Sequence, residues 1–79
     1  MATYSYADFR KVLSRLGFVQ KRSRKHEQWE KRLPDGRSLR VSLSHQHGQD
    51  IPRRLFFKML RQAGIESEEE FARILRGGK

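Results

Sequence analysis

A turn signal in the middle of the chain constrains its fold more than any other feature. In Leu33-Pro34-Asp35-Gly36-Arg37, the proline presets φ and the glycine accepts a positive φ, which is typical of a tight turn. After the turn, apolar residues alternate with polar ones at Leu39, Val41 and Leu43, as in a strand with one buried face. The pattern predicts a β-hairpin centred on this turn.

The residues before the turn also alternate in a way that predicts two strand faces. Successive side chains of a strand point to opposite sides of a sheet. One side is expected to carry Trp29, Lys31 and Leu33, and the other His26, Gln28 and Glu30. A further extended stretch begins at residues 18–23. The middle of the chain is therefore predicted to be a three-stranded antiparallel meander.

Apolar residues at helical spacing predict a helix before these strands, over residues 5–16. Its stripe consists of Phe9, Val12, Leu13 and Leu16. Ser5 and Asp8 have the spacing of a capping box, and Gly17 is placed to end the helix in the left-handed conformation. The basic residues of the helix are expected to point away from the stripe; they are Arg10, Lys11 and Arg15.

Two helices are predicted after the strands. Pro52 suits the first turn of a helix that runs to Ala63 and stops at Gly64. Its buried side is expected to consist of Leu55, Phe56, Met59, Leu60 and Ala63. Ser67 and Glu70 have the spacing of another capping box. The short third helix that follows has an apolar face made of Phe71, Ile74 and Leu75.

The predicted order is α-β-β-β-α with a short extra C-terminal helix, which belongs to the α+β class. A three-stranded antiparallel sheet with helices on one face is the architecture of double-stranded-RNA-binding-like domains. The 79 residues suffice for a single domain, 1–79, with a compact core and no deep cofactor cleft. The other face of the sheet is expected to stay open, polar and basic.

Positive charge is concentrated in the first half of the chain. The formal net charge is +9, and eleven Lys or Arg residues stand against three acids between Arg10 and Arg40. Such a surface attracts a phosphate backbone, and counterion release supplies affinity that is independent of sequence. There are two alternatives. The surplus of positive charge only keeps the protein in solution, or it binds an acidic lipid surface. We favour nucleic acid as the partner.

Composition excludes several other classes. The chain has no cysteine, so disulfides and thiolate metal sites are excluded. No apolar run approaches the ~20 residues that span a bilayer, and the first ten residues lack a signal-peptide core. We expect a soluble cytoplasmic protein without a membrane partner. His45 and His47 have a spacing that suits metal, but no further ligand accompanies them, so no metal or other cofactor is predicted.

The order of several short motifs resembles one known family. They are Leu13-Ser14-Arg15-Leu16-Gly17-Phe18, Lys25-His26-Glu27-Gln28-Trp29, Pro34-Asp35-Gly36-Arg37, Val41–Leu43, His45 with His47, and Met59-Leu60-Arg61-Gln62-Ala63-Gly64-Ile65. In this order, over roughly Phe9 to Leu75, they resemble the HicA-type mRNA interferase toxins. The resemblance implies a type II toxin-antitoxin pair, in which an endoribonuclease halts translation by cleaving mRNA. It also implies neutralisation by a HicB-type antitoxin protein.

The same resemblance implies that His26 is the catalytic residue. Histidine suits proton transfer because its unperturbed pKa lies near neutrality. The cations near it in sequence or on nearby strand positions are expected to bind RNA and stabilise the phosphorane; they are Arg22, Arg24, Lys25, Lys31 and Arg40. The alternative for His26 is a surface histidine that contacts phosphate or nothing at all. Trp29 is predicted to belong to the core rather than to stack on a base, and Phe57 to be partly exposed.

Two other functions remain open at the level of sequence. Ser23-Arg24-Lys25 replaces the glycine that the family usually has before the histidine, and glycine opens backbone geometry that other residues avoid. A non-catalytic RNA-binding module of the same fold is therefore the first alternative. A protein-interaction domain whose basic face docks an acidic partner is the second.

Overall fold

The computed structural model of this chain describes residues 3–21, 26–44 and 48–77. Its elements follow the predicted order. They are α1 (Tyr6–Arg15), β1 (Val19–Lys21), β2 (His26–Arg32), β3 (Ser38–Ser44), α2 (Arg53–Ala63) and α3 (Glu68–Leu75). The three strands form one antiparallel sheet in the order β1-β2-β3. The predicted α+β fold with a meander and an extra C-terminal helix is confirmed.

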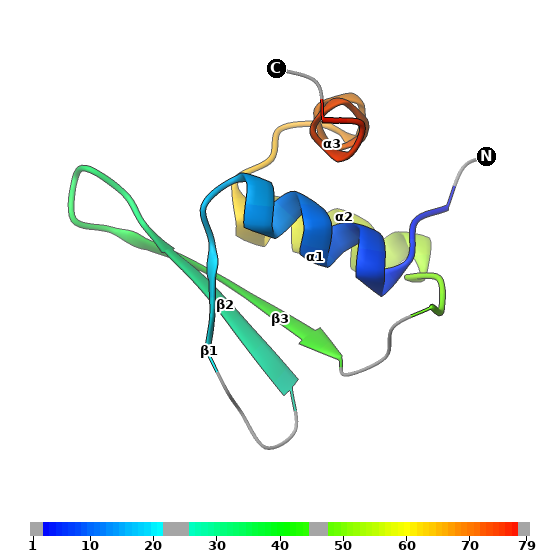
Figure 1. Cartoon of the computed structure of the whole chain (residues 1–79), viewed down its shortest axis with the longest axis horizontal. Helices are drawn as coiled ribbons and strands as arrows, with labels where there is room; N and C mark the ends of the chain where they lie inside the picture. The colour runs from blue at the N-terminus through cyan, green and yellow to red at the C-terminus, as the bar shows by residue number, and fades with distance from the viewer. Residues whose placement is uncertain (1–2, 22–25, 45–47, 78–79) are drawn as a thin grey trace.

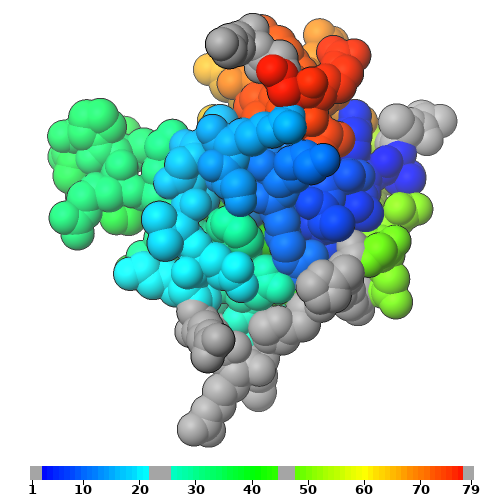
Figure 2. Space-filling model, viewed as in Figure 1, coloured from blue at the N-terminus to red at the C-terminus, as the bar shows by residue number. Residues whose placement is uncertain are grey.

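The elements lie in layers. Figure 1 shows α1 and α2 next to each other over one face of the sheet, with α3 on the side of these two helices away from the sheet. The hairpin between β2 and β3 extends beyond the helices, and its tip protrudes from the body of the molecule in Figure 2. No helix covers the opposite face of the sheet in the described part of the chain, as the sequence predicted.

One hydrophobic core joins the layers. The inward side chains of the sheet, Trp29, Val41 and Leu43, are buried against the stripe of α1 and the apolar face of α2. Phe71 of α3 contacts the rings of Phe9 and Phe56, with centroids 5.1 and 5.0 Å apart. This aromatic cluster fixes α3 to the other helices, because edge and tilted ring contacts add to the burial of large apolar side chains.

Local signals in the sequence explain where the helices begin and end. At α1, the Ser5 hydroxyl accepts from the Asp8 amide at 3.1 Å and the Asp8 carboxylate accepts from the Ser5 amide at 3.0 Å, so the predicted capping box is formed. Gly17 has a φ of 93°, the left-handed region that ends the helix. At α3, the Ser67 hydroxyl accepts from the Glu70 amide, while the Glu70 carboxylate accepts from the amide of Glu66 instead of closing a box.

The second helix differs from the prediction in two details. Pro52 is the N-cap residue, with an extended ψ of 139°, and α2 proper begins one residue later. Leu55 was predicted to be buried, which is wrong, since its side chain is 38% exposed. The buried stripe is narrower and consists of Phe56, Met59, Leu60 and Ala63 at positions i, i+3, i+4 and i+7. Leu55 and Phe57 lie at opposite edges of that stripe, because residues two apart on a helix do not share a face, and both are exposed.

Candidate functional site

The pairing register of the strands divides the sheet into two chemically different faces. His26 lies opposite Ser44, Gln28 opposite Ser42, and Glu30 opposite Arg40. On the other side of β2, Lys21 lies opposite Gln28 and Val19 opposite Glu30. Because paired residues point to the same side of a sheet, all of these side chains share the face that the helices leave uncovered. We call this the open face; it also includes Arg32 and Ser38.

His26 is the first residue of β2, and its side chain is exposed on the open face. This agrees with the predicted alternation, which put it on the side of the strand opposite Trp29. Trp29 is buried in the core, as predicted. The imidazole therefore stands at the start of a paired strand and is accessible from solvent, and a proton-transfer group that acts on a polymer must be accessible.

The described cation nearest to His26 by register on the open face is Lys21. Lys21 pairs with Gln28, which makes it a diagonal neighbour of His26, at a typical backbone separation of roughly 7–8 Å. Sequence reasoning did not select Lys21 as a site residue. The sequence could indicate that Lys21 is exposed and on which side of its strand it lies. It could not indicate the pairing of β1 with β2 that brings Lys21 beside His26.

The predicted RNA-binding residues do not all share the open face. Arg40 does, and its Nε lies 3.6 Å from a carboxylate oxygen of Glu30 across the sheet. Lys31 is half-buried on the opposite side of β2, next to Leu39 in register, so its side chain does not join His26. Arg22, Arg24 and Lys25 lie outside the described residues, as do His45 and His47.

A buried ion pair lies directly behind the histidine. Arg10 of α1 donates from Nε to Glu27 Oε1 and from Nη2 to Glu27 Oε2, both at 2.8 Å, and Nη2 also donates to the Ser44 carbonyl at 2.8 Å. Glu27 follows His26 in β2, and Ser44 is the cross-strand partner of His26. One guanidinium thus ties α1 to the residue that follows His26 on β2 and to the cross-strand partner of His26 on β3. We call these three residues the clamp.

The clamp is mostly removed from water. The side chains of Arg10 and Glu27 are 15% and 8% exposed, and the indole nitrogen of Trp29 donates to Glu27 Oε1 at 3.1 Å. The remaining nitrogen, Arg10 Nη1, is buried without a hydrogen-bond partner in the described parts of the chain. The expectation that Arg10 points away from the core side of α1 is therefore wrong. The burial of Glu27 was predictable from the sequence, because Glu27 and the buried Trp29 are two residues apart and so point to the same side of the strand.

The described residues offer little evidence for other kinds of site. Within residues 3–21, 26–44 and 48–77, no group of three or more histidines and carboxylates stands close enough to hold a metal ion. Over the same ranges, every helix is too short or too polar to cross a bilayer.

Comparison with known proteins identifies the family. The family model for the HicA toxin of bacterial toxin-antitoxin systems matches residues 6–65 of the sequence. This range runs from the start of α1 to just beyond α2 and is more than half of the chain. No curated protein and no solved structure matches it. The matched range contains the whole sheet, the clamp and His26. The chain therefore belongs to the HicA toxin family of bacterial toxin-antitoxin systems.

Proposed function

We propose that this toxin is an endoribonuclease that cleaves messenger RNA without a metal ion, with His26 as the proton-transfer residue. The observation that carries the proposal is the position of His26. It is exposed at the end of an uncovered, polar face that also holds Lys21 and Arg40, and the buried clamp fixes the strands beneath it. The chain belongs to a toxin family, and this supports messenger RNA as the target, because its loss would stop growth.

The proposed reaction uses the RNA's own 2′-hydroxyl as the nucleophile. His26 takes the 2′ proton while the 2′ oxygen forms a bond to the adjacent phosphorus. The bond from phosphorus to the 5′ oxygen of the next nucleotide breaks, and that oxygen takes a proton from water. The products are a 2′,3′-cyclic phosphate and a free 5′-hydroxyl. No external nucleophile or redox partner is required.

Charge on the open face supports the same reaction. Negative charge grows on the phosphoryl oxygens in the transition state, and cations already in place stabilise it without reorganisation. Lys21 is the described residue best placed for this role. Arg22, Arg24 and Lys25 stand immediately before His26 in the chain, and their phosphate-binding role stays a prediction, as does that of Lys31.

A toxin of this family acts together with an antitoxin. We infer that the partner is a HicB-type protein and that the pair acts in the cytoplasm, where messenger RNA is translated. An antitoxin that covers the open face would block His26 from RNA.

A second function has one observation in its favour. The motif before His26 reads Ser23-Arg24-Lys25, without the glycine usual in the family, while the basic open face needs no such glycine to hold RNA. A chain of this kind would bind RNA through the same face and leave it intact. Expression of the protein separates this function from the first.

The first test is growth arrest in a bacterial host. Induction of the parent chain is expected to stop growth and to fragment messenger RNA, and His26→Ala is expected to do neither, because the proton-transfer group is lost. Arg37→Ala is the matched control, since Arg37 is exposed in the hairpin turn and pairs only with Asp35 of the same turn among the described residues. Arrest by His26→Ala as strong as that by the parent would remove the catalytic assignment.

A further inference from the structure

The open face continues away from His26 as a shallow groove. Val19 and Lys21 of β1, Glu30 and Arg32 of β2, and Ser38 of β3 line a volume of about 280 Å³. Glu30 is four residues from His26 along β2, roughly 13 Å at the usual rise of a strand. RNA whose reacting phosphate lies at His26 meets this groove a few nucleotides along its chain, because both lie on the same face of one sheet.

One apolar side chain, that of Val19, lines the groove. Val19 is 60% exposed and is one of three large hydrophobic residues left exposed in the described ranges; the others, Leu55 and Phe57, lie on α2. By register, Lys21 lies two residues from Val19 along β1, and Arg32 lies two residues beyond Glu30, the cross-strand partner of Val19. An apolar patch between two cations suits a nucleotide, whose base is flat and largely apolar on its faces and whose flanking phosphates are negative.

The groove also contains one carboxylate, that of Glu30. The Glu30 side chain is 29% exposed, and Arg40 holds one of its oxygens at 3.6 Å. A carboxylate repels phosphate and is acceptor-only, so it favours the donor groups of bases. Guanine is the base that presents two adjacent donors, N1–H and the exocyclic amino group, on its Watson–Crick edge. The other three bases place an acceptor beside each donor on that edge, which a carboxylate disfavours.

We propose that this groove is a base-recognition subsite for an unpaired guanine in the RNA substrate, read by Glu30. Val19 packs against the base, and Lys21 and Arg32 contact the flanking phosphates. Arg40 positions the Glu30 carboxylate. The proposal rests on the proposed function only in taking RNA as the ligand; it does not require cleavage.

Binding to short RNAs tests the subsite without chemistry. Four eight-nucleotide RNAs are titrated by fluorescence anisotropy: oligouridine, and oligouridine with one central guanine, adenine or cytosine. Each is titrated against the His26→Ala chain and against His26→Ala with Glu30→Gln. We expect the guanine oligomer to bind about tenfold more tightly than oligouridine, in the range of one good bidentate base contact, and Glu30→Gln to remove that preference. His26→Ala with Glu69→Gln is the matched control, because Glu69 is an exposed acid on α3.

Equal affinity for the four oligomers would overturn the proposal, and so would a guanine preference that survives both Glu30→Gln and Glu30→Ala. Circular dichroism of each variant establishes that the sheet is intact. The parent chain, incubated with the same oligomers, separates the two proposals. A guanine preference in binding with no cutting by the parent would refute the proposed function and leave the subsite standing. Cutting by the parent without any guanine preference in binding would support the proposed function and refute the subsite.

Discussion

At the scale of single residues, the clamp of Arg10, Glu27 and Ser44 places a largely buried ion pair next to His26. Bidentate pairing of an arginine with a carboxylate is geometrically specific, and here both charges are largely buried. Removing one partner of a buried pair leaves an uncompensated charge, whereas removing both can be nearly neutral. The clamp is therefore expected to fix geometry at His26 more than to add net stability.

Arg10→Met is expected to lower the free energy of unfolding by roughly 3–5 kcal/mol, because the buried Glu27 carboxylate loses both hydrogen bonds from the guanidinium. Urea denaturation measures the change. Lys11→Met is the control, since Lys11 is the exposed neighbour on the same helix, and it should change stability by no more than about 0.5 kcal/mol. The double variant Arg10→Met with Glu27→Met should recover part of the loss. If Arg10→Met were as mild as Lys11→Met, the buried pair would have no structural role.

At this scale the sequence predicted correctly that His26 is exposed on the side of the strand opposite Trp29, but it did not predict the clamp. Strand alternation was enough to separate His26 from the buried Trp29, because parity is a property of one strand. Arg10 and Glu27 are seventeen positions apart, and only the packing of α1 on β2 brings them together. No local pattern reports such a contact.

At the scale of elements, α3 is fastened to the rest of the fold at both ends. Arg53 at the start of α2 donates to Glu68 at the start of α3, at 2.8 and 3.1 Å. At the other end, Arg15 of α1 donates to the carbonyls of Ile74 and Leu75, each at 2.7 Å. Cations are favourable at a helix C-terminus, so this second contact suits the dipole of α3.

Hydrogen bonds from Arg53 lower the pKa of Glu68 below its ordinary value of 4.5. A depressed pKa in the folded state stabilises the fold above the unfolded value, and the contribution is lost as the pH falls through the folded one. Glu68→Gln is therefore expected to be less stable than the parent near neutral pH and to converge with it in acid. Thermal unfolding between pH 7 and pH 3 measures the difference. Glu69→Gln, the exposed neighbour, should run parallel to the parent; a constant gap for Glu68→Gln would contradict the linkage.

The order of the elements was predictable from the sequence, but some details of α2 were not. The proline-aspartate-glycine turn, the capping residues of α1 and α3, and the helical and strand spacing of apolar residues together indicate the order of the elements. The exposure of Leu55 depends on how α2 is rotated about its axis. Phe56 fixes that rotation, because its ring contacts those of Phe9 on α1 and Phe71 on α3. Helical spacing alone accepts Leu55 as readily as its neighbours.

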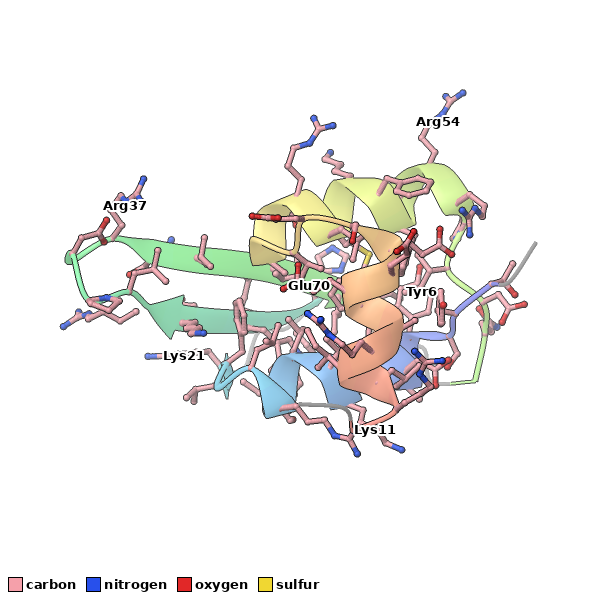
Figure 3. The ribbon with its side chains drawn as sticks, turned by 90° about the horizontal axis from the view of Figure 1, so that it is seen from above. Tyr6, Lys11, Lys21, Arg37, Arg54 and Glu70 are labelled. Atoms are coloured by element: carbon pink, nitrogen blue, oxygen red, sulfur yellow. The ribbon has the colours of Figure 1, made fainter. Side chains whose placement is uncertain are left out.

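At the scale of the whole molecule, the net charge of +9 predicts affinity for RNA but not which surface binds it. Basic side chains point outward from several elements; Figure 3 shows Arg54 on α2 and Lys11 on α1 on opposite sides of the molecule. The register of the strands is the information that selects the open face, and it could not be read from composition. Lys31, which the sequence predicted to bind RNA, lies on the side of the sheet that faces the helices. Lys21, which it did not predict, lies beside His26 on the open face.

Salt dependence tests the face assignment. Lys21→Gln is expected to reduce the slope of log affinity against log salt by about 0.7, the loss of one phosphate contact to single-stranded RNA. Arg54→Gln changes the net charge equally on a distant helix and should leave the slope unchanged. Anisotropy titrations with an unstructured RNA at several salt concentrations measure both. The opposite ranking of the two variants would place the RNA on α2 instead.

The most direct test of the central claim is the chemistry of the cut ends. The purified parent chain and its His26→Ala variant are incubated with a long unstructured RNA in EDTA, and the termini are identified by mass spectrometry. We predict that the parent alone cuts, leaving 2′,3′-cyclic phosphates or their hydrolysed products, and that a 2′-deoxy nucleotide at a cleavage site abolishes cutting there. Cutting by His26→Ala at the parent's rate, or RNA left intact by a parent that binds it, would contradict the assignment of His26 as the residue that cleaves RNA.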